Sequence, residues 1–226
     1  MTLGPPHDWV ERDLRARFPV LADQAIEAWE IARSAIADGR LEAAALSRLS
    51  VFCRDRSSRL RDWAAAVVAH LAVRFPEAQN VLAAMAGNGS QAQALAVFAG
   101  LHAQGSEELR EHCFRLALRH RSSKVRALAG SHILRCELRN LLPALAQAVD
   151  VETDVDCRAE LQDVLALLRD GHLMEYGTAG DVRITVAMGP ATVSQHFSEA
   201  EVSEQSLSAL LAGLRESARR ILRFLP

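Results

Sequence analysis

Cationic side chains gather in two short polar segments of the chain, residues 54–61 and 119–126, whereas residues 150–156 are acidic. Guanidinium and ammonium groups bind carboxylates and phosphates, so such clusters are typical of surfaces that dock an acidic partner. The alternative is that these segments are ordinary solvated turns. We expect partner contacts from five cations: Arg54, Arg56, Arg59, Arg121 and Lys124. A structural role, in hydrogen bonds between neighbouring repeats, is expected instead for Arg61, Arg126 and Arg158.

Asp62 and Trp63 are adjacent, and the chain has two more tryptophans, Trp9 and Trp29. In these residue types it resembles DNA glycosylases that are built from HEAT-like repeats and excise alkylated bases in a basic groove. Neighbours in a helix point about 100° apart, so the adjacency of Asp62 and Trp63 is weak evidence for a shared pocket. Duplex DNA also needs cations on the helices that it contacts. Several positions there are neutral or acidic: Gln91, Gln93, Glu160 and Asp163. A nucleic-acid-binding or glycosylase-like repair protein is therefore the second hypothesis.

Other reactive side chains lack the spacing that catalysis or metal binding requires. His112 and His120 are eight residues apart, twice the spacing of a zinc-binding histidine pair on a helix. The segment GNGS at 87–90 lacks the lysine of a phosphate-binding loop and is interpreted as a plain turn. No CxxC pair occurs, so the cysteines are expected to be small buried apolar residues: Cys53, Cys113, Cys136 and Cys157. The sequence favours a protein without catalytic activity, and it calls for no metal and no cofactor.

The elements that must position these residues are predicted from a repeat. Similar helix starts recur at Ser58, Ser90, Ser122 and Thr153, in steps of 32, 32 and 31 residues. A fixed period of this size is typical of stacked helical repeats. The predicted helix pairs are 41–53 with 57–71, 77–86 with 90–103, 107–119 with 122–137, and 140–149 with 154–169. Apolar residues three and four apart place a stripe on one face of each second helix, and neighbouring pairs must stack to bury it.

The turns within the pairs resemble those of the HEAT-like repeat family, in its shorter bacterial form. That family typically has an acidic residue in the turn and an arginine six positions later. Asp55 with Arg61 and Glu152 with Arg158 fit the pattern. Two repeats depart from it, with His120 before Arg126 and with Gly87 before Gln93. The resemblance implies an all-α fold, a right-handed α-α superhelix, over roughly residues 41–170.

The two ends of the chain are predicted to cap this stack, so that the whole forms a single structural unit. Residues 1–40 are expected to form two capping helices, one from a capping box of Asp8 with Glu11 and one from Pro19 to Gly39. Within residues 171–226, alternating side chains predict two short strands, 173–176 and 182–188, around a turn. Gly189 and Pro190 then end the hairpin. A second capping box, Ser198 with Glu201, is expected to open a final helix to about Phe224.

Composition limits the classes of protein to which the chain can belong. Of its 226 residues 50% are hydrophobic and only 5% aromatic, as in helices that pack through Ala, Leu and Val. Because the net charge is −2, an acidic or nucleic-acid partner must be met by a local patch. The N-terminal segment does not form a signal peptide, and no apolar run reaches the length of a membrane span. The sequence therefore predicts a cytoplasmic protein without a membrane partner.

The leading hypothesis for function is a non-catalytic scaffold or adaptor for protein interaction. Its curved helical surface and charged turn edge would dock one macromolecular partner, preferentially a protein with an acidic patch. The hairpin at 173–188 has strand edges that can pair with another copy of the chain. A third hypothesis is a chromophore or prosthetic-group attachment factor, because some short HEAT-like proteins assist bilin attachment. No residue of the chain supports that role specifically.

Overall fold

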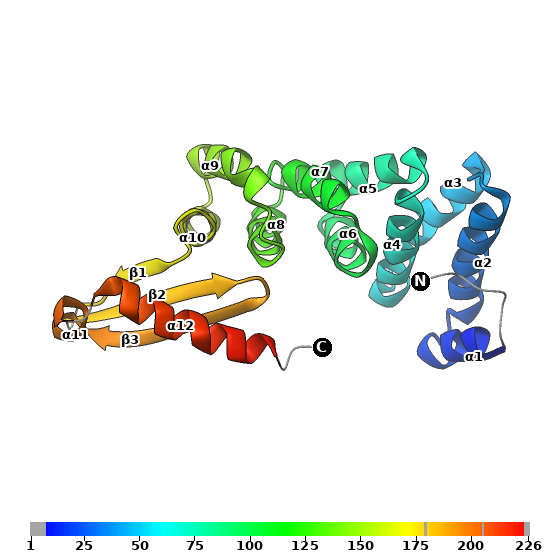
Figure 1. Cartoon of the computed structure of the whole chain (residues 1–226). Coiled ribbons are helices and arrows are strands. Elements are labelled where there is room, and N and C mark those ends of the chain that lie inside the picture. Colours follow the sequence, from blue (N-terminus) through cyan, green and yellow to red (C-terminus); the bar gives the residue numbers. More distant parts are fainter. Residues whose placement is uncertain (1–7, 179, 205, 224–226) are drawn as a thin grey trace. The chain divides into compact units, whose positions relative to one another are not determined.

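The fold is known from a computed structural model, which describes residues 8–178, 180–204 and 206–223 (Figure 1). The chain is mostly helical, with one small three-stranded antiparallel sheet in its C-terminal part. It divides into two compact units, the first ending at Val125 and the second beginning at Arg126. None of the helices in the described part of the chain is long and apolar enough to cross a membrane.

The first unit consists of helices joined by short turns. They are α1 (Asp8–Arg17), α2 (Ala22–Asp38), α3 (Ala43–Phe52), α4 (Ser58–Ala72), α5 (Pro76–Asn88), α6 (Gln91–Gln104), α7 (Glu107–Ala117) and the start of α8 (Ser123–Arg135). The helices predicted for this region are confirmed. One expected start is wrong, because Pro19 lies in the turn before α2 and that helix begins at Ala22. The capping box expected at Asp8 involves a side chain outside the described residues.

Small residues let the second helices of this unit lie close together. The stripe expected on α4 is buried, since Leu60, Ala64 and Leu71 are inaccessible to solvent. Helix α6 approaches α4 at Gly100, where an added Cβ would lie 2.8 Å from the carbonyl oxygen of Ala65. Small side chains on α4 and α6 therefore allow the axes of these two helices to lie close together.

The helix starts follow the predicted period with small shifts. Ser90 caps α6 through a capping box with Gln93, as its position in the repeat indicates. The N-cap of α4 is Ser57, one residue before the predicted Ser58. The N-cap of α10 is Asp154, one residue after the predicted Thr153, and its carboxylate accepts the N–H of Cys157. These shifts leave the repeat intact.

The second unit combines helices with the sheet. After the rest of α8 come a 3₁₀ turn η1 (Arg139–Leu141), α9 (Leu142–Val151), α10 (Val155–Asp170), β1 (Leu173–Tyr176), β2 (Asp181–Met188), β3 (Ala191–Ser198), α11 (Glu199–Glu204) and α12 (Leu207–Leu222). The β1–β2 hairpin is confirmed, with Met174 opposite Ile184. The expected end of the strands is wrong, because Gly189 and Pro190 form a turn that leads into a third strand, β3.

The C-terminal helix is also interrupted. Ser198 and Glu201 form the expected capping box, with the Glu201 carboxylate accepting the Ser198 N–H at 2.7 Å. That box opens only the short α11, and Ser206 then caps the separate helix α12. The apolar face of α12, with Leu210, Leu211 and Leu214, packs on one face of β2, which supplies Val182, Ile184 and Val186.

Candidate functional site

The five cations predicted to contact a partner all lie in the first unit. Every one of these side chains is exposed, and none forms a hydrogen bond or ion pair with another described residue: Arg54, Arg56, Arg59, Arg121 and Lys124. Arg54 and Arg56 belong to the turn between α3 and α4, and Arg59 to the first turn of α4. Arg121 belongs to the turn between α7 and α8, and Lys124 to the first turn of α8. We call them the edge cations.

Contacts between successive turns show that these turns form one continuous edge. A polar hollow of about 370 Å³ joins Arg54 to Asn88 and Gly89 of the next turn. On the other side of that turn, the Nε2–H of His120 donates to the carbonyl oxygen of Gly89 at 3.0 Å. The edge therefore runs from the α3–α4 turn through the α5–α6 turn to the α7–α8 turn.

One position has the same structural task in the α3–α4 and α7–α8 turns. Two residues before the N-cap, the carboxylate of Asp55 accepts the N–H of Ser57 at 2.8 Å. In the α7–α8 turn His120 replaces the acid, and its Nδ1 accepts the N–H of Ser122 at 3.0 Å. His120 is buried with 1% of its surface exposed, and this double hydrogen bond explains why a histidine can stand there.

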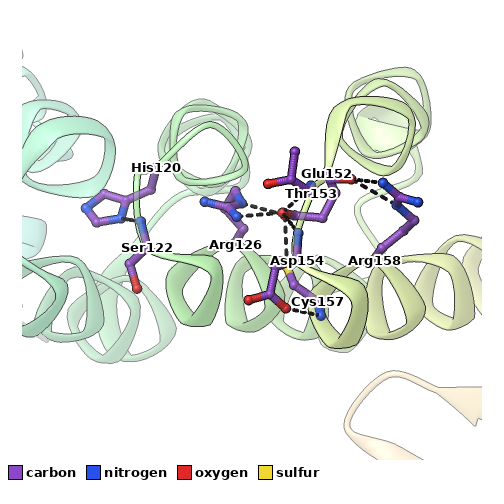
Figure 2. A network of polar contacts seen from close by, with 8 residues as sticks. All are labelled: His120, Ser122, Arg126, Glu152, Thr153, Asp154, Cys157 and Arg158. Atoms are coloured by element: carbon purple, nitrogen blue, oxygen red, sulfur yellow. Dashed lines mark hydrogen bonds and ion pairs between the residues drawn. The ribbon is translucent and has the colours of Figure 1, made fainter.

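In the second unit the same position is held by Glu152, at the centre of the network in Figure 2. Its carboxylate accepts hydrogen bonds from Arg126 at 2.6 Å and from the N–H of Asp154 at 3.0 Å. These bonds, the Arg126 pair first, lower the pKa of Glu152 to about 2. The thiol of Cys157 also donates to Glu152, and burial first, then this carboxylate, raises the pKa of Cys157 to about 12. The charges of Glu152 and Arg126 are thus paired with each other within the network.

The arginines expected to be structural do form hydrogen bonds, but only one of them joins two repeats. Arg126 on α8 binds Glu152 before α10, as expected. The expectation is wrong for Arg61 and Arg158, which donate at 2.9 Å to the carbonyl oxygens of Asp55 and Glu152 in their own turns. The arginine six positions after the acidic residue thus joins the turn to the helix that follows it.

The first unit also contains an open groove of about 620 Å³. It lies between the end of α1, the start of α4 and the end of α6, and its walls include Arg17, Phe18, Arg59, Asp62, Trp63 and Gln104. A smaller apolar pocket of about 110 Å³ adjoins it, with walls from α2, α4 and α6 that include Trp29, Trp63, Val67, His70 and Gln104. Trp63, Ala66 and Gln104 belong to both cavities. We call the two together the Trp63 groove.

The indole of Trp63 is fixed in place. Its Nε1–H donates to the carbonyl oxygen of Ala25 at 3.0 Å, and its ring lies 6.1 Å from that of Phe18. A rigid aromatic wall beside an apolar pocket can bind one large apolar side chain.

The rim of the groove carries charge of both signs. Arg59 is one of the edge cations, whereas Arg17 is engaged in an ion pair with Asp13 at 2.9 Å. The pKa of Asp62 is raised by partial burial, against the opposing effect of Arg61. Asp62 and Trp63 both line the wide groove, although their adjacency in the sequence is only weak evidence for a shared pocket.

Sequence reasoning missed Phe18, His70 and Gln104, which come from three separate segments with no common motif. No cluster of His, Cys, Asp and Glu that could hold a metal ion occurs among the described residues. Three of the cysteines are buried as expected, and Cys136 is partly buried. No family model, curated protein or solved structure matches the chain.

Proposed function

We propose that this protein is a non-catalytic interaction module that binds a segment of a partner protein on its first unit. The Trp63 groove takes an apolar side chain of that segment, and the edge cations bind its acidic residues. The observation that carries the proposal is Arg59, which is both an edge cation and a wall of the groove that Trp63 lines. One segment can thus reach both surfaces.

The architecture supports this role. The helix pairs α3–α4, α5–α6 and α7–α8 have polar turns at one edge, and the second helices α4 and α6 line the groove. We infer that these pairs form a right-handed superhelix of the HEAT-like type. In such repeats, neighbouring second helices form a continuous surface that suits an elongated partner segment.

The chemistry of the surface selects the partner. The narrow pocket has almost entirely apolar walls, so it favours a leucine or aromatic side chain over a polar one. Within the described part of the chain no carboxylate binds the edge cations, so carboxylates of the partner would supply their hydrogen bonds. The partner segment is therefore acidic with at least one large apolar residue.

Selection from a random peptide library displayed on phage tests this proposal without a known partner. We expect enrichment of peptides that combine Asp or Glu with one large apolar residue. A labelled selected peptide should then lose about tenfold or more in affinity for Ala66→Leu, which fills both cavities, and for Arg59→Gln. Fluorescence anisotropy measures this loss.

Matched controls are Ala99→Leu on the exposed side of α6 and Arg74→Gln at the end of α4. Both should bind the peptide as the natural chain does. Absence of enrichment, or equal losses in test and control variants, would contradict the proposal.

Binding of nucleic acid is a second candidate, because Asp62 and Trp63 share the wide groove. A glycosylase-like protein would use such a carboxylate beside an aromatic wall that stacks on an extruded base. A gel-shift assay with duplex DNA that contains an alkylated base tests it. We expect binding that weakens steeply with salt and base release that Asp62→Asn abolishes; without a shift at moderate salt this candidate fails.

A further inference from the structure

Strand β3 is an open edge of the sheet in the second unit. The strand order is β1-β2-β3, so β3 pairs with β2 on one side and forms the outer margin on the other (Figure 1). It is eight residues long, and most of its side chains are exposed. Backbone N–H and C=O groups along such a margin are a template for a further strand.

The turn before β3 determines which backbone groups point outward. Gly189 and Pro190 are the two turn residues, so Met188 and Ala191 face each other as a hydrogen-bonded pair. Hydrogen-bonded and non-bonded pairs then alternate along an antiparallel ladder. The outward N–H and C=O groups consequently belong to the even-numbered residues of the strand: Thr192, Ser194, His196 and Ser198. The N–H of Ser198 is bonded to Glu201, so the open part of the edge centres on Ser194 and His196.

The side chains of β3 do not protect this edge. Natural edge strands usually carry lysine, other charges or proline, and the sequence ATVSQHFS has none of these apart from one histidine. Val193 and Phe197 lie on the α12 side of the sheet, half-buried against the core of Val182, Ile184 and Leu210. The apolar core thus continues to the very margin of the sheet.

We propose that β3 pairs antiparallel with β3 of a second copy of this chain and joins the two sheets into one. Residues directly opposite each other in an antiparallel pair point to the same face of the sheet. With a two-fold axis normal to the sheet, odd-numbered residues of one copy therefore lie opposite odd-numbered residues of the other, and even opposite even. The register centred on Gln195 places Val193 of each copy opposite Phe197 of the other. Both apolar residues then extend the core under α12, and Ser194 faces His196 on the polar side.

A second copy fits this edge better than a strand of other chemistry. The strand carries no Asp, Glu, Lys or Arg, so two copies approach without like-charge repulsion and without an unmatched charge. The sequence predicts self-association through the hairpin 173–188 instead. However, β2 lies between β1 and β3, and that hairpin offers only the four-residue edge of β1, which an Arg183–Glu175 ion pair flanks.

A cysteine placed on the two-fold axis tests both the pairing and its register. Gln195 would face its own copy as a non-hydrogen-bonded pair with Cα atoms about 4.5 Å apart, within the range of a disulfide. In a Cys136→Ser background, which removes the one partly buried native thiol, Gln195→Cys should form a cross-linked dimer under mild oxidation. Ser194→Cys, equally exposed on the same strand, should cross-link at least about tenfold more slowly because its copy lies two residues away.

Light scattering on the natural chain supplies the second readout. We expect the mass of two chains at about 100 µM, and a shift toward one chain for Ser194→Pro. This change removes an outward N–H and the hydroxyl bond to Thr185, and it leaves the backbone hydrogen bonds to β2 in place. Circular dichroism should show an unchanged helical signal for this variant. A monomeric natural chain, faster cross-linking of Ser194→Cys, or an unchanged mass for Ser194→Pro would each overturn the proposal. Monomeric chains that instead bind an added β-strand peptide at β3 would assign the edge to another protein.

Discussion

Glu152 is held by several charge-assisted hydrogen bonds in the second unit. Its side chain is 1% exposed, and its carboxylate is held by Arg126, by two backbone N–H groups and by a thiol. Glu152→Gln removes the charge while keeping the shape. We expect the free energy of unfolding to fall by about 2 kcal/mol at neutral pH, because hydrogen bonds to charged groups are lost. Chemical denaturation measures the change.

The stabilisation that Glu152 contributes should decrease at low pH. Because the pKa of Glu152 falls from 4.5 in the unfolded chain to about 2 in the fold, its stabilisation is complete above pH 4.5. It is lost as the pH falls toward 2, where the carboxylate becomes protonated in both states. The gap in stability between the natural chain and Glu152→Gln should therefore narrow over that range. A gap that stays constant would show that the lowered pKa does not contribute.

His120 is a second residue whose role can be isolated. His120→Ala leaves the carbonyl oxygen of Gly89 and the N–H of Ser122, both partly buried, without their partner. We expect a loss of about 2 kcal/mol in the free energy of unfolding. His112→Ala, on the exposed side of α7, is the control and should change it by less than about 0.5 kcal/mol. Equal effects would refute a specific role for the His120 hydrogen bonds.

At this scale the sequence predicted part of the network. The acid and the arginine six positions later are visible as a pattern at Asp55 with Arg61 and at Glu152 with Arg158. The task of His120 is not visible there, because an imidazole that replaces a carboxylate does so through a tertiary contact with Gly89. Residue type alone does not reveal that contact.

Among the elements, the close approach of α4 and α6 depends on Gly100. A methyl group there would lie 2.8 Å from both the carbonyl carbon and the oxygen of Ala65, and helix backbone cannot yield as a side chain does. Gly100→Ala should therefore lower the free energy of unfolding by about 2 kcal/mol, despite the better helix propensity of alanine. Thermal or denaturant unfolding checks the value.

Gly213→Ala on α12 is the matched control. No atom lies within 4 Å of the added Cβ, so only helix propensity changes, and stability should rise by about 0.5–1 kcal/mol. Effects of the same sign at Gly100 and Gly213 would contradict the close packing of α4 on α6.

Helices were easier to predict than strands because their apolar residues recur over three or four turns. The stripe of Cys157, Leu161 and Leu168 fixes α10 from sequence alone. The alternation of apolar and polar residues is weak in β3, because Val193 and Phe197 are the only apolar residues in its exposed part. Gly189 with Pro190 also suggests the end of the sheet and not a turn into another strand. The break between α11 and α12 depends on Ser206, whose hydroxyl accepts the N–H of Ala209.

Over the whole molecule, charge is distributed so that a chain of net charge −2 presents unpaired cations along one edge of its first unit. The sequence shows those cations but not the Trp63 groove beside them. The walls of the groove run from Ala16 to Gln104, and no local pattern links residues so far apart. Only the packing of α1, α4 and α6 brings Phe18 to Trp63.

Neutralising part of the edge separates its function from its stability. Arg54, Arg56 and Arg121 can be changed to glutamine together, and Arg12, Arg74 and Arg115 form a control set of equal charge on exposed positions of the same unit. The selected peptide should bind the edge variant about tenfold more weakly, and its affinity should depend less on salt, because fewer charges are screened. The control should bind within about twofold of the natural chain.

Both variants should melt within about 2 °C of the natural chain, because none of these side chains forms a hydrogen bond or ion pair with a described residue. Differential scanning fluorimetry measures this. If the control set weakened binding as much as the edge set, the net charge of the chain would explain the attraction. If the edge variant melted much earlier, these arginines would stabilise the fold, and their exposure would not indicate a partner.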